Sequence, residues 1–207
     1  MHISEGVLSP SVLAAGAALT AAGTWIGLRR ADYSRLLTVA ILSSVFFVGS
    51  LIHVPLGPGS VHLVLNGLLG LFLGWAVFPA LLVALLLQAV LFQFGGIAVL
   101  GVNVFNMAFP ALLCHFAFGP LLGGTRTQRT AGAFCCGALS VAGAALLTAI
   151  SLGLSNEGFL ASAKLLLLAH IPVMLLEGLI VAFAVSFIAR VRPEILYPPA
   201  KKPKEAL

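Results

Sequence analysis

The sequence predicts an all-α protein that crosses a membrane seven times. Hydrophobic residues make up 60% of its 207 residues and charged residues only 8%, with a mean hydropathy of +1.13. A soluble domain of this length cannot bury so much apolar surface. The apolar residues also gather in runs of about 20 residues, the length of helix that crosses a bilayer. These observations place the chain among the polytopic helical membrane proteins.

The seven predicted spans are apolar runs bounded by charges or turn residues. The first ends at Arg29-Arg30, and the fourth starts at Pro79, because proline is favoured in the first turn of a helix. The third and fourth are short and joined by an uncharged turn at 75–79. The predicted spans are residues 7–28, 36–54, 61–78, 79–94, 98–122, 131–153 and 160–189.

These spans predict one transmembrane domain over residues 1–190. The basic remainder, residues 191–207, contains four prolines, and we expect it to be a poorly ordered cytoplasmic tail. The net charge of +5 comes from short clusters at the ends of spans. It therefore does not indicate a nucleic-acid partner.

The basic residues predict the orientation of the chain. Lys164 lies on one side of the predicted bundle, and the other ten lysines and arginines lie on the opposite side. Those ten residues are Arg29, Arg30, Arg35, Arg126, Arg129, Arg190, Arg192, Lys201, Lys202 and Lys204. Cytoplasmic loops carry an excess of lysine and arginine. We therefore expect a multi-pass protein of the cell inner (plasma) membrane, with its N-terminus outside and its C-terminus in the cytoplasm.

Met1 and His2 form a candidate metal chelate. A free N-terminus followed by histidine offers three nitrogens: the Met1 amine, the His2 amide and the His2 imidazole. Together they close a five-membered and a six-membered ring and leave one place open in their plane. A square-planar field of nitrogens suits Ni(II), Cu(II) or low-spin Co(II), whereas zinc prefers a tetrahedron. The competing interpretation is a frayed terminus that binds nothing.

The open place in this plane needs a remote fourth ligand. His62 is the first candidate, because it stands where an outer loop becomes the third span, next to glycine-rich backbone. It could equally be a solvent-facing loop histidine. His53, at the outer end of the second span, is the alternative ligand, and His115 is interpreted as a core or interface residue. The cysteines are interpreted as packing residues: Cys114, Cys135 and Cys136.

Amide side chains lie inside two of the predicted spans. Asn103 and Asn106 are three residues apart and therefore share a helix face near the outer end of the fifth span. Polar groups at that depth are usually hydrogen-bonded within the bundle. The two asparagines could orient the N-terminal segment or simply join helices. Gln88 and Gln93 in the fourth span leave the same two interpretations open.

His170 and Glu177 lie two turns apart on one face of the seventh span. An intramembrane glutamate is energetically expensive and is a functional candidate by default. The pair could line an ion or proton path. Glu177 could equally serve as a structural hydrogen-bonding group or a subunit contact.

Motifs for ATP hydrolysis and enzymatic catalysis are absent from the sequence. It contains no Gly-x-x-x-x-Gly-Lys-Ser/Thr phosphate loop, no His-Glu-x-x-His zinc motif and no Gly-x-Ser-x-Gly nucleophile motif. The chain is therefore predicted not to be an enzyme.

Five motifs, in order along essentially the whole chain, resemble one known family. They are Met-His-Ile-x-Glu-Gly at the N-terminus, Gly-Ser-Val-His at 59–62, Gln-Ala-Val-Leu-Phe followed by Gly-Gly within 88–96, Leu-Gly-Val-Asn-Val-Phe-Asn-Met at 100–107 and His-Ile-Pro-Val-Met-Leu-Leu-Glu-Gly at 170–178. The sequence resembles the CbiM/NikM family, the cobalt/nickel substrate-binding (S) component of energy-coupling factor (ECF) ABC-type transporters.

The resemblance implies a seven-helix S component with its N-terminal residues plugged into the bundle. It implies that Co(II) or Ni(II) binds to Met1, His2 and His62, that Asn103 and Asn106 support the site, and that no organic cofactor is present. The implied partners are an ECF coupling (T) transmembrane protein, an ABC ATPase pair and often a small accessory membrane subunit.

Two alternatives remain open at the level of sequence. The residues after His62, 63–67, depart from the Pro-Thr-Gly-type continuation of cobalt members, which leaves the choice between nickel and cobalt open. The runner-up function is a self-sufficient secondary divalent-metal transporter or channel that uses the His170/Glu177 face. A purely structural membrane subunit, which would bind no metal, is a third possibility.

Overall fold

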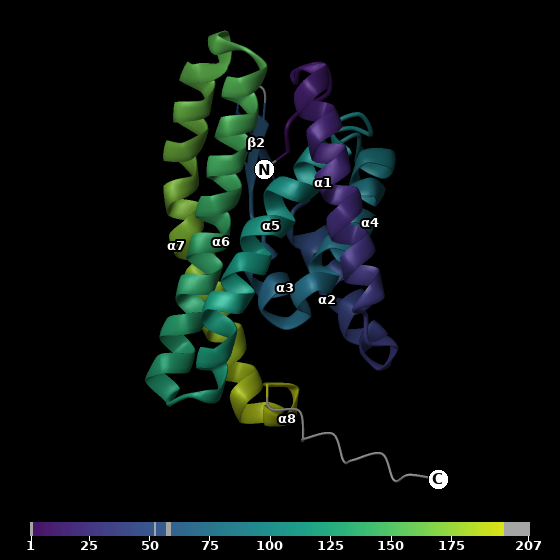
Figure 1. The fold of residues 1–207 in the computed structure, drawn as a ribbon. Helices are drawn as coiled ribbons and strands as arrows, with labels where there is room; N and C mark the ends of the chain where they lie inside the picture. Colours follow the sequence, from purple (N-terminus) through teal and green to yellow (C-terminus); the bar gives the residue numbers. More distant parts are fainter. Residues whose placement is uncertain (1, 52, 57–58, 197–207) are drawn as a thin grey trace, which may run out of the picture.

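The computed structural model describes residues 2–51, 53–56 and 59–196, and it confirms the all-α class (Figure 1). Short 3-10 turns precede α2, α4 and α7 and follow α5. The helices are α1 (Pro10–Arg29), α2 (Leu36–Gly49), α3 (Asn66–Leu73), α4 (Val77–Phe92), α5 (Leu100–Phe118), α6 (Arg126–Ser155), α7 (Leu160–Val191) and α8 (Pro193–Leu196). One antiparallel hairpin joins β1 (His53–Leu56) to β2 (Gly59–His62).

Within the described residues, five helical segments are long and apolar enough to cross a membrane. They are Pro10–Arg29, Asn66–Phe92, Leu100–Gly123, Arg126–Ser155 and Glu157–Val191, while α2 is apolar but has only 14 residues. The chain is therefore a multi-pass membrane protein. The seven predicted spans correspond to fewer full-length helices, because the second and third differ from the prediction.

The hairpin replaces parts of two predicted spans. The second was predicted to be helical to residue 54, but α2 ends at Gly49, and the third was predicted to start at 61, where the chain is still in β2. The sequence from 55 to 59 contains two prolines and two glycines. Proline lacks the backbone N–H that a helix needs, and glycine favours turns, so a hairpin is the better local solution.

The chain reverses direction between α3 and α4. A β-carbon on Gly70 would lie 2.4 Å from the carbonyl oxygen of Ala111, and one on Gly74 would lie 3.1 Å from His115, so α3 runs alongside α5 in the same direction. Gly74 adopts a positive φ of 53°, which ends α3. The turn thus falls before the predicted start at Pro79, which is the third residue of α4.

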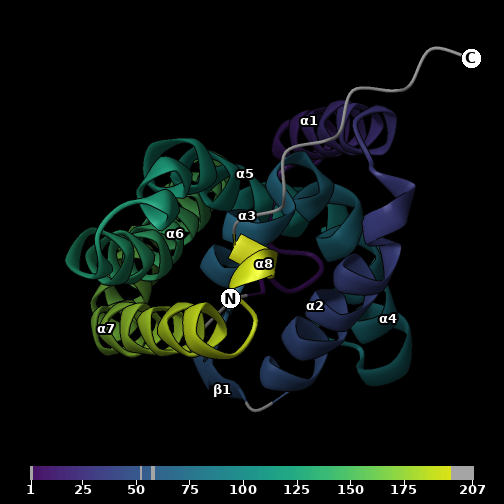
Figure 2. The same cartoon turned by 90° about the horizontal axis from the view of Figure 1, so that it is seen from below.

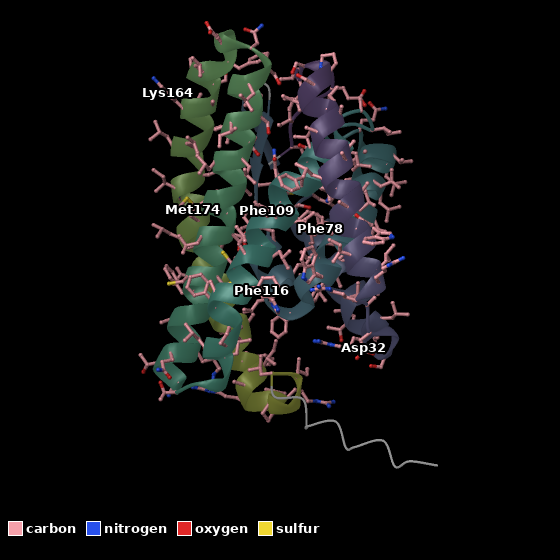
Figure 3. The ribbon with its side chains drawn as sticks, in the orientation of Figure 1. Asp32, Phe78, Phe109, Phe116, Lys164 and Met174 are labelled. Atoms are coloured by element: carbon pink, nitrogen blue, oxygen red, sulfur yellow. The ribbon has the colours of Figure 1, made fainter. Side chains whose placement is uncertain are left out.

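The helices form two groups around α3 and α5. Helices α6 and α7 pair on one side and α1, α2 and α4 lie on the other, with α3 and α5 between them (Figure 2). The 30–35 and 119–125 loops and the end of α7 lie at one end of the bundle, and Lys164 lies at the other (Figures 1 and 3). The described arginines of these loops therefore gather at one end, the distribution on which the predicted orientation depends.

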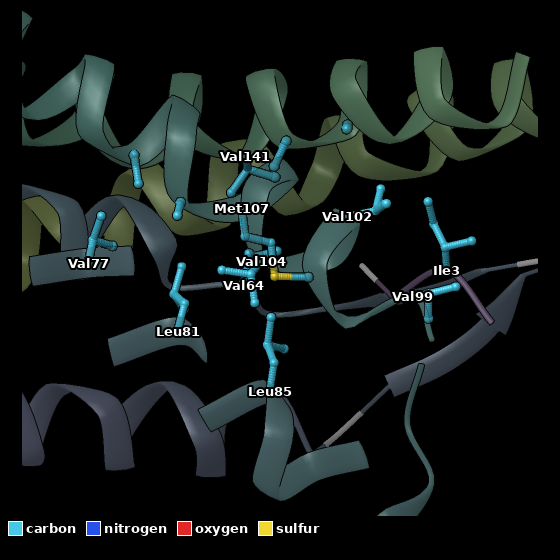
Figure 4. Packing of buried hydrophobic residues seen from close by; sticks show 14 of the residues in the cluster. Ile3, Val64, Val77, Leu81, Leu85, Val99, Val102, Val104, Met107 and Val141 are labelled. Carbon is cyan, nitrogen blue, oxygen red and sulfur yellow. The ribbon is translucent and has the colours of Figure 1, made fainter. Parts of the chain in front are cut away.

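The N-terminal segment belongs to the core of the bundle. Ile3 and Val64 are fully buried and pack with Met107 and Val141 in one hydrophobic cluster that continues through α4, α5 and α6 (Figure 4). The first residues are thus plugged into the bundle. The tail predicted to be poorly ordered, residues 191–207, begins with the end of α7 and with α8, which packs through Leu196, and its residues 197–207 lie outside the described part.

The close contact at Gly70 generates a stability prediction. Gly70→Ala should lower the free energy of unfolding by about 1–3 kcal/mol, because α5 must move away from the new methyl group. The measurement is a lower midpoint of thermal unfolding in detergent. Gly123→Ala is the matched control, since nothing lies within 4 Å of its added β-carbon. Equal destabilisation by both substitutions would contradict the proposed close contact.

Candidate metal centre

The structure brings His2 and His62 together inside the bundle. The Nδ1 atom of His2 lies 3.0 Å from the Nε2 atom of His62, and the two ring centroids are 4.7 Å apart. Both side chains are buried, with exposed fractions of 6% and 4%. His2 arrives on the N-terminal segment and His62 at the end of β2, so residues 60 positions apart in the chain form one buried pair.

The separation of these two nitrogens fits adjacent positions in a square plane. With metal–nitrogen bonds of about 2 Å, adjacent nitrogens lie about 2.8 Å apart in a plane and about 3.3 Å apart in a tetrahedron. The 3.0 Å between His2 Nδ1 and His62 Nε2 is nearer to the planar value. Nδ1 is also the His2 ring nitrogen through which an N-terminal chelate closes its six-membered ring.

Gln88 sets the tautomer of His2. Its Nε2 donates to the carbonyl of Phe47 at 3.1 Å and to Ser50 Oγ at 2.5 Å, and a carbonyl can only accept, so the amide oxygen of Gln88 faces His2. His2 Nε2 lies 2.9 Å from that oxygen and must carry the ring proton. Nδ1 therefore presents a lone pair.

A backbone carbonyl sets the tautomer of His62 in the same way. His62 Nδ1 donates to the carbonyl of Leu63 at 2.6 Å, so its Nε2 also presents a lone pair. When both rings are neutral, the two nitrogens that face each other over 3.0 Å both present lone pairs, an arrangement that a cation between or beside them stabilises. Burial, reinforced by repulsion from His170, lowers the pKa of His62, which lies outside the spanning helices, to about 4.

Asn103 holds the N-terminal segment in place. Its Oδ1 accepts from the backbone N–H of Ile3 at 3.0 Å and its Nδ2 donates to the Ile3 carbonyl at 3.1 Å. Glu5 adds two contacts with the loop after α4: its N–H donates to the carbonyl of Gly95, and its Oε1 accepts from the N–H of Ala98. Both the N–H and the C=O of Ile3, the residue after His2, are therefore hydrogen-bonded to Asn103.

The structure separates the two predicted asparagines. Asn106 Nδ2 lies 3.3 Å from Ser151 Oγ and 3.5 Å from Thr148 Oγ1, so Asn106 joins α5 to α6 rather than contacting the N-terminal segment. Gln93 is an exposed residue at the end of α4 with a positive φ of 58°.

Of the remaining candidates, two are only partly described. Met1 lies outside the described residues. The hairpin register pairs His53 with His62, but the His53 side chain is outside the described part. His115 Nδ1 lies 3.1 Å from the carbonyl of Leu71, which joins α5 to α3 at a distance from the histidine pair.

His170 and Glu177 are both fully buried on α7. His170 Nδ1 donates to the carbonyl of Leu166, one turn earlier. Glu177 Oε1 accepts from the N–H groups of Val64 and Leu65. No group of three His, Cys, Asp or Glu side chains within residues 2–51, 53–56 and 59–196 could hold a metal, so these two residues do not form a second metal cluster there.

The sequence offered Gln88 as a residue that orients the N-terminal segment or joins helices, and Glu177 as a functional or structural hydrogen-bonding group, but it did not identify their partners. Ser50, which accepts from Gln88, gave no signal, because serine is common in transmembrane helices. Phe94, whose ring stands edge-on to His2 at a centroid distance of 6.3 Å, lies in a loop and was equally inconspicuous.

Two buried imidazoles inside an apolar, multi-pass bundle form a candidate metal site in a membrane protein. Comparison with known proteins specifies the class further. The chain belongs to the CbiM family, described as the cobalt uptake substrate-specific transmembrane region, whose profile matches residues 2–195. It is a membrane component of cobalt/nickel transport and not an enzyme.

Several relatives align over nearly the whole chain. A putative metal transport protein of Haemophilus influenzae is 46% identical over 95% of this chain and 97% of its own length. The fused nickel transport protein NikMN of Rhodobacter capsulatus is 32% identical over 96% of this chain and 64% of its own. The cobalt transport protein CbiM of Sorangium cellulosum is 31% identical over 95% and 94%.

A solved structure supports the same assignment. The crystal structure of a transition metal transporter superposes with a TM-score of 0.75 at 29% identity, covering 92% of this chain and 93% of that one. The fold and the family thus agree.

The unequal contacts of the two asparagines generate the second prediction. Asn103→Ala should weaken Ni(II) binding about 10–100-fold, because the residue after His2 loses both of its backbone hydrogen bonds. Asn106→Ala, the matched control on the same helix, should change affinity much less. Titration calorimetry of both variants in detergent measures this difference, and equal losses would contradict the role of Asn103.

Proposed function

We propose that this chain is the substrate-binding component of an ATP-driven importer that captures Ni(II) or Co(II). The metal would take four nitrogens: the Met1 amine, the His2 amide, His2 Nδ1 and His62 Nε2. The observation that carries the proposal is the buried pair of ring nitrogens, His2 Nδ1 and His62 Nε2, which lie 3.0 Å apart.

The donor set favours ions that accept a planar nitrogen field. Two of its four proposed nitrogens are the Met1 amine and the His2 amide. Replacement of an amide proton and a square-planar field suit Ni(II), Cu(II) and low-spin Co(II) better than zinc. This donor set would favour such ions over zinc, with nickel and cobalt as joint candidates.

Partner subunits would supply the energy for transport. The chain contains no phosphate-binding loop, so ATP hydrolysis belongs to an ABC ATPase pair joined through an ECF coupling (T) protein, often with a small accessory membrane subunit. The names of two fused relatives support the presence of further transporter components beside this chain. This chain spans 64% of the fused nickel transport protein NikMN and 36% of the putative fused cobalt transport protein CbiMQ of Methanocorpusculum labreanum.

The basic residues support an orientation in the cell inner (plasma) membrane. The described arginines gather at the end of the bundle that holds the 30–35 and 119–125 loops. The positive-inside tendency makes that end cytoplasmic, with the N-terminus and the hairpin on the outer side, where the metal would arrive. Residues 1–190 then form the transmembrane domain, and the tail from 191 is cytoplasmic.

The alternative of a secondary transporter with an ion path along α7 has less support. His170 Nδ1 and Glu177 Oε1 are bound to backbone groups, while His170 Nε2 and Glu177 Oε2 have no hydrogen-bond partner among the described residues. Neither residue joins a cluster of ligating side chains within the described part of the chain.

The chelate makes a prediction about the N-terminus. A histidine-free extension fused ahead of Met1 should lower Ni(II) affinity at least about 100-fold, because the Met1 amine becomes a peptide amide and the chelate loses its terminal nitrogen. The same extension fused after Leu207 is the control. Calorimetry compares both fusions with the untagged chain: unchanged affinity in the N-terminal fusion rules the chelate out.

Reconstitution separates the proposed importer from the secondary transporter. In proteoliposomes, Ni(II) uptake should require added coupling and ATPase subunits together with ATP. The control is the same vesicle preparation with the chain alone under an imposed pH gradient. Uptake driven by that gradient alone would favour the alternative.

A further inference from the structure

The three residues between β2 and α3 have no regular secondary structure, although they lie inside the bundle. Val64 is fully buried, and Leu65 adopts a left-handed φ of 51°, which is unusual for a non-glycine residue. In an apolar environment such backbone is tolerated only where the protein itself supplies hydrogen-bond partners. Here the partner is one carboxylate oxygen.

Glu177 is that partner. Its Oε1 accepts from the N–H of Val64 at 2.5 Å and from the N–H of Leu65 at 2.8 Å, although Glu177 lies 113 residues from Val64 along the chain. The Glu177 side chain is fully buried, and its Oε2 has no hydrogen-bond partner among the described residues. The visible role of the carboxylate is therefore to hold this short segment.

One planar unit connects Glu177 to His62. The N–H of Val64 and the C=O of Leu63 belong to the same peptide group, which is rigid and planar. Its N–H side is bound by Glu177, and its C=O side accepts the Nδ1 proton of His62 at 2.6 Å. Rotation of this peptide would move the oxygen that sets the tautomer and direction of the His62 ring.

We infer that Glu177 is a positioning residue for the metal centre: through the Leu63–Val64 peptide it directs His62 Nε2 toward the fourth ligand position. This inference rests on the proposed metal-binding function. Glu177 touches no ligand atom and acts through the backbone alone. What this role requires of the side chain at position 177 is an acceptor oxygen within hydrogen-bond distance of the Val64 N–H. Its negative charge is secondary.

A pair of substitutions at position 177 separates reach from charge. Glu177→Gln keeps an acceptor oxygen at the same distance and removes the charge, whereas Glu177→Asp keeps the charge and withdraws the oxygen by one methylene group. Untagged wild-type and variant proteins in detergent are loaded with Ni(II). The visible absorption band of planar Ni(II) and the affinity by calorimetry are measured on the folded, monodisperse fraction. His62→Ala marks the band of a site that has lost its fourth nitrogen.

The inference predicts that Glu177→Gln keeps the wild-type band and an affinity within about 3-fold of wild type. Glu177→Asp should shift the band to the His62→Ala position and lose about 10–100-fold in affinity, as expected for loss of a ligand-orienting contact. Adding His62→Ala to Glu177→Asp should then change neither quantity further. Val181→Ala, at a buried residue one turn along α7, is the control for general destabilisation and should keep the wild-type band.

Three outcomes would overturn the inference. A wild-type band in Glu177→Asp would show that the reach of the oxygen is irrelevant. A His62→Ala band in Glu177→Gln would show that charge decides. A shifted band in Val181→Ala would show that destabilisation of α7 alone moves it.

The remaining outcomes are also decisive. If Glu177→Asp does not fold, the Glu177→Gln band decides alone: the wild-type position supports the inference and the His62→Ala position overturns it. A wild-type protein that binds Ni(II) without a planar band overturns the inference, because the planar centre on which it depends is absent. If the wild-type protein binds neither Ni(II) nor Co(II), the proposed function itself fails, which is a distinct result.

Discussion

Burying a polar N-terminal segment in an apolar bundle is the constraint on which the rest of this structure depends. Each unpaired peptide group in such an environment costs several kcal/mol, so the segment can enter only where partners are prepared. Asn103 binds both backbone atoms of Ile3, and Glu5 is tied to the loop after α4. These amide and carboxylate contacts satisfy polar backbone groups of the segment inside the bundle.

The same constraint governs the strand and loop that deliver His62. The backbone between β2 and α3 is irregular and buried, and Glu177 on α7 supplies the acceptor that it needs. The metal centre is thus assembled from three separate regions of the chain. The acceptor of each ring proton is fixed by further hydrogen bonds. Gln88, which accepts from His2, donates to Phe47 and Ser50. The Leu63 carbonyl, which accepts from His62, belongs to the peptide group whose N–H donates to Glu177.

The positions of the ring protons on His2 and His62 determine which nitrogens of the two rings can bind a cation. Because Gln88 and the Leu63 carbonyl each take a ring proton, the remaining nitrogens of the two neutral rings face each other over 3.0 Å in a buried position. Two neutral rings so placed repel each other slightly and favour a cation. In the proposed metal site, the surrounding hydrogen bonds would orient both rings before binding and reduce the reorganisation that binding requires.

The sequence alone determined the membrane class and identified the N-terminal chelate, with His62 or His53 as its remote ligand, as a candidate, because composition, position in the chain and residue type carry these properties directly. The tertiary structure decided the hairpin, the short α3 and the different contacts of Asn103 and Asn106. It also placed Gln88 against His2, and Glu177 against the peptide that accepts the His62 ring proton. The reason is physical: a polar side chain in an apolar helix requires a hydrogen-bond partner, and this requirement is visible in the sequence. Which backbone atom becomes that partner depends on the folded chain.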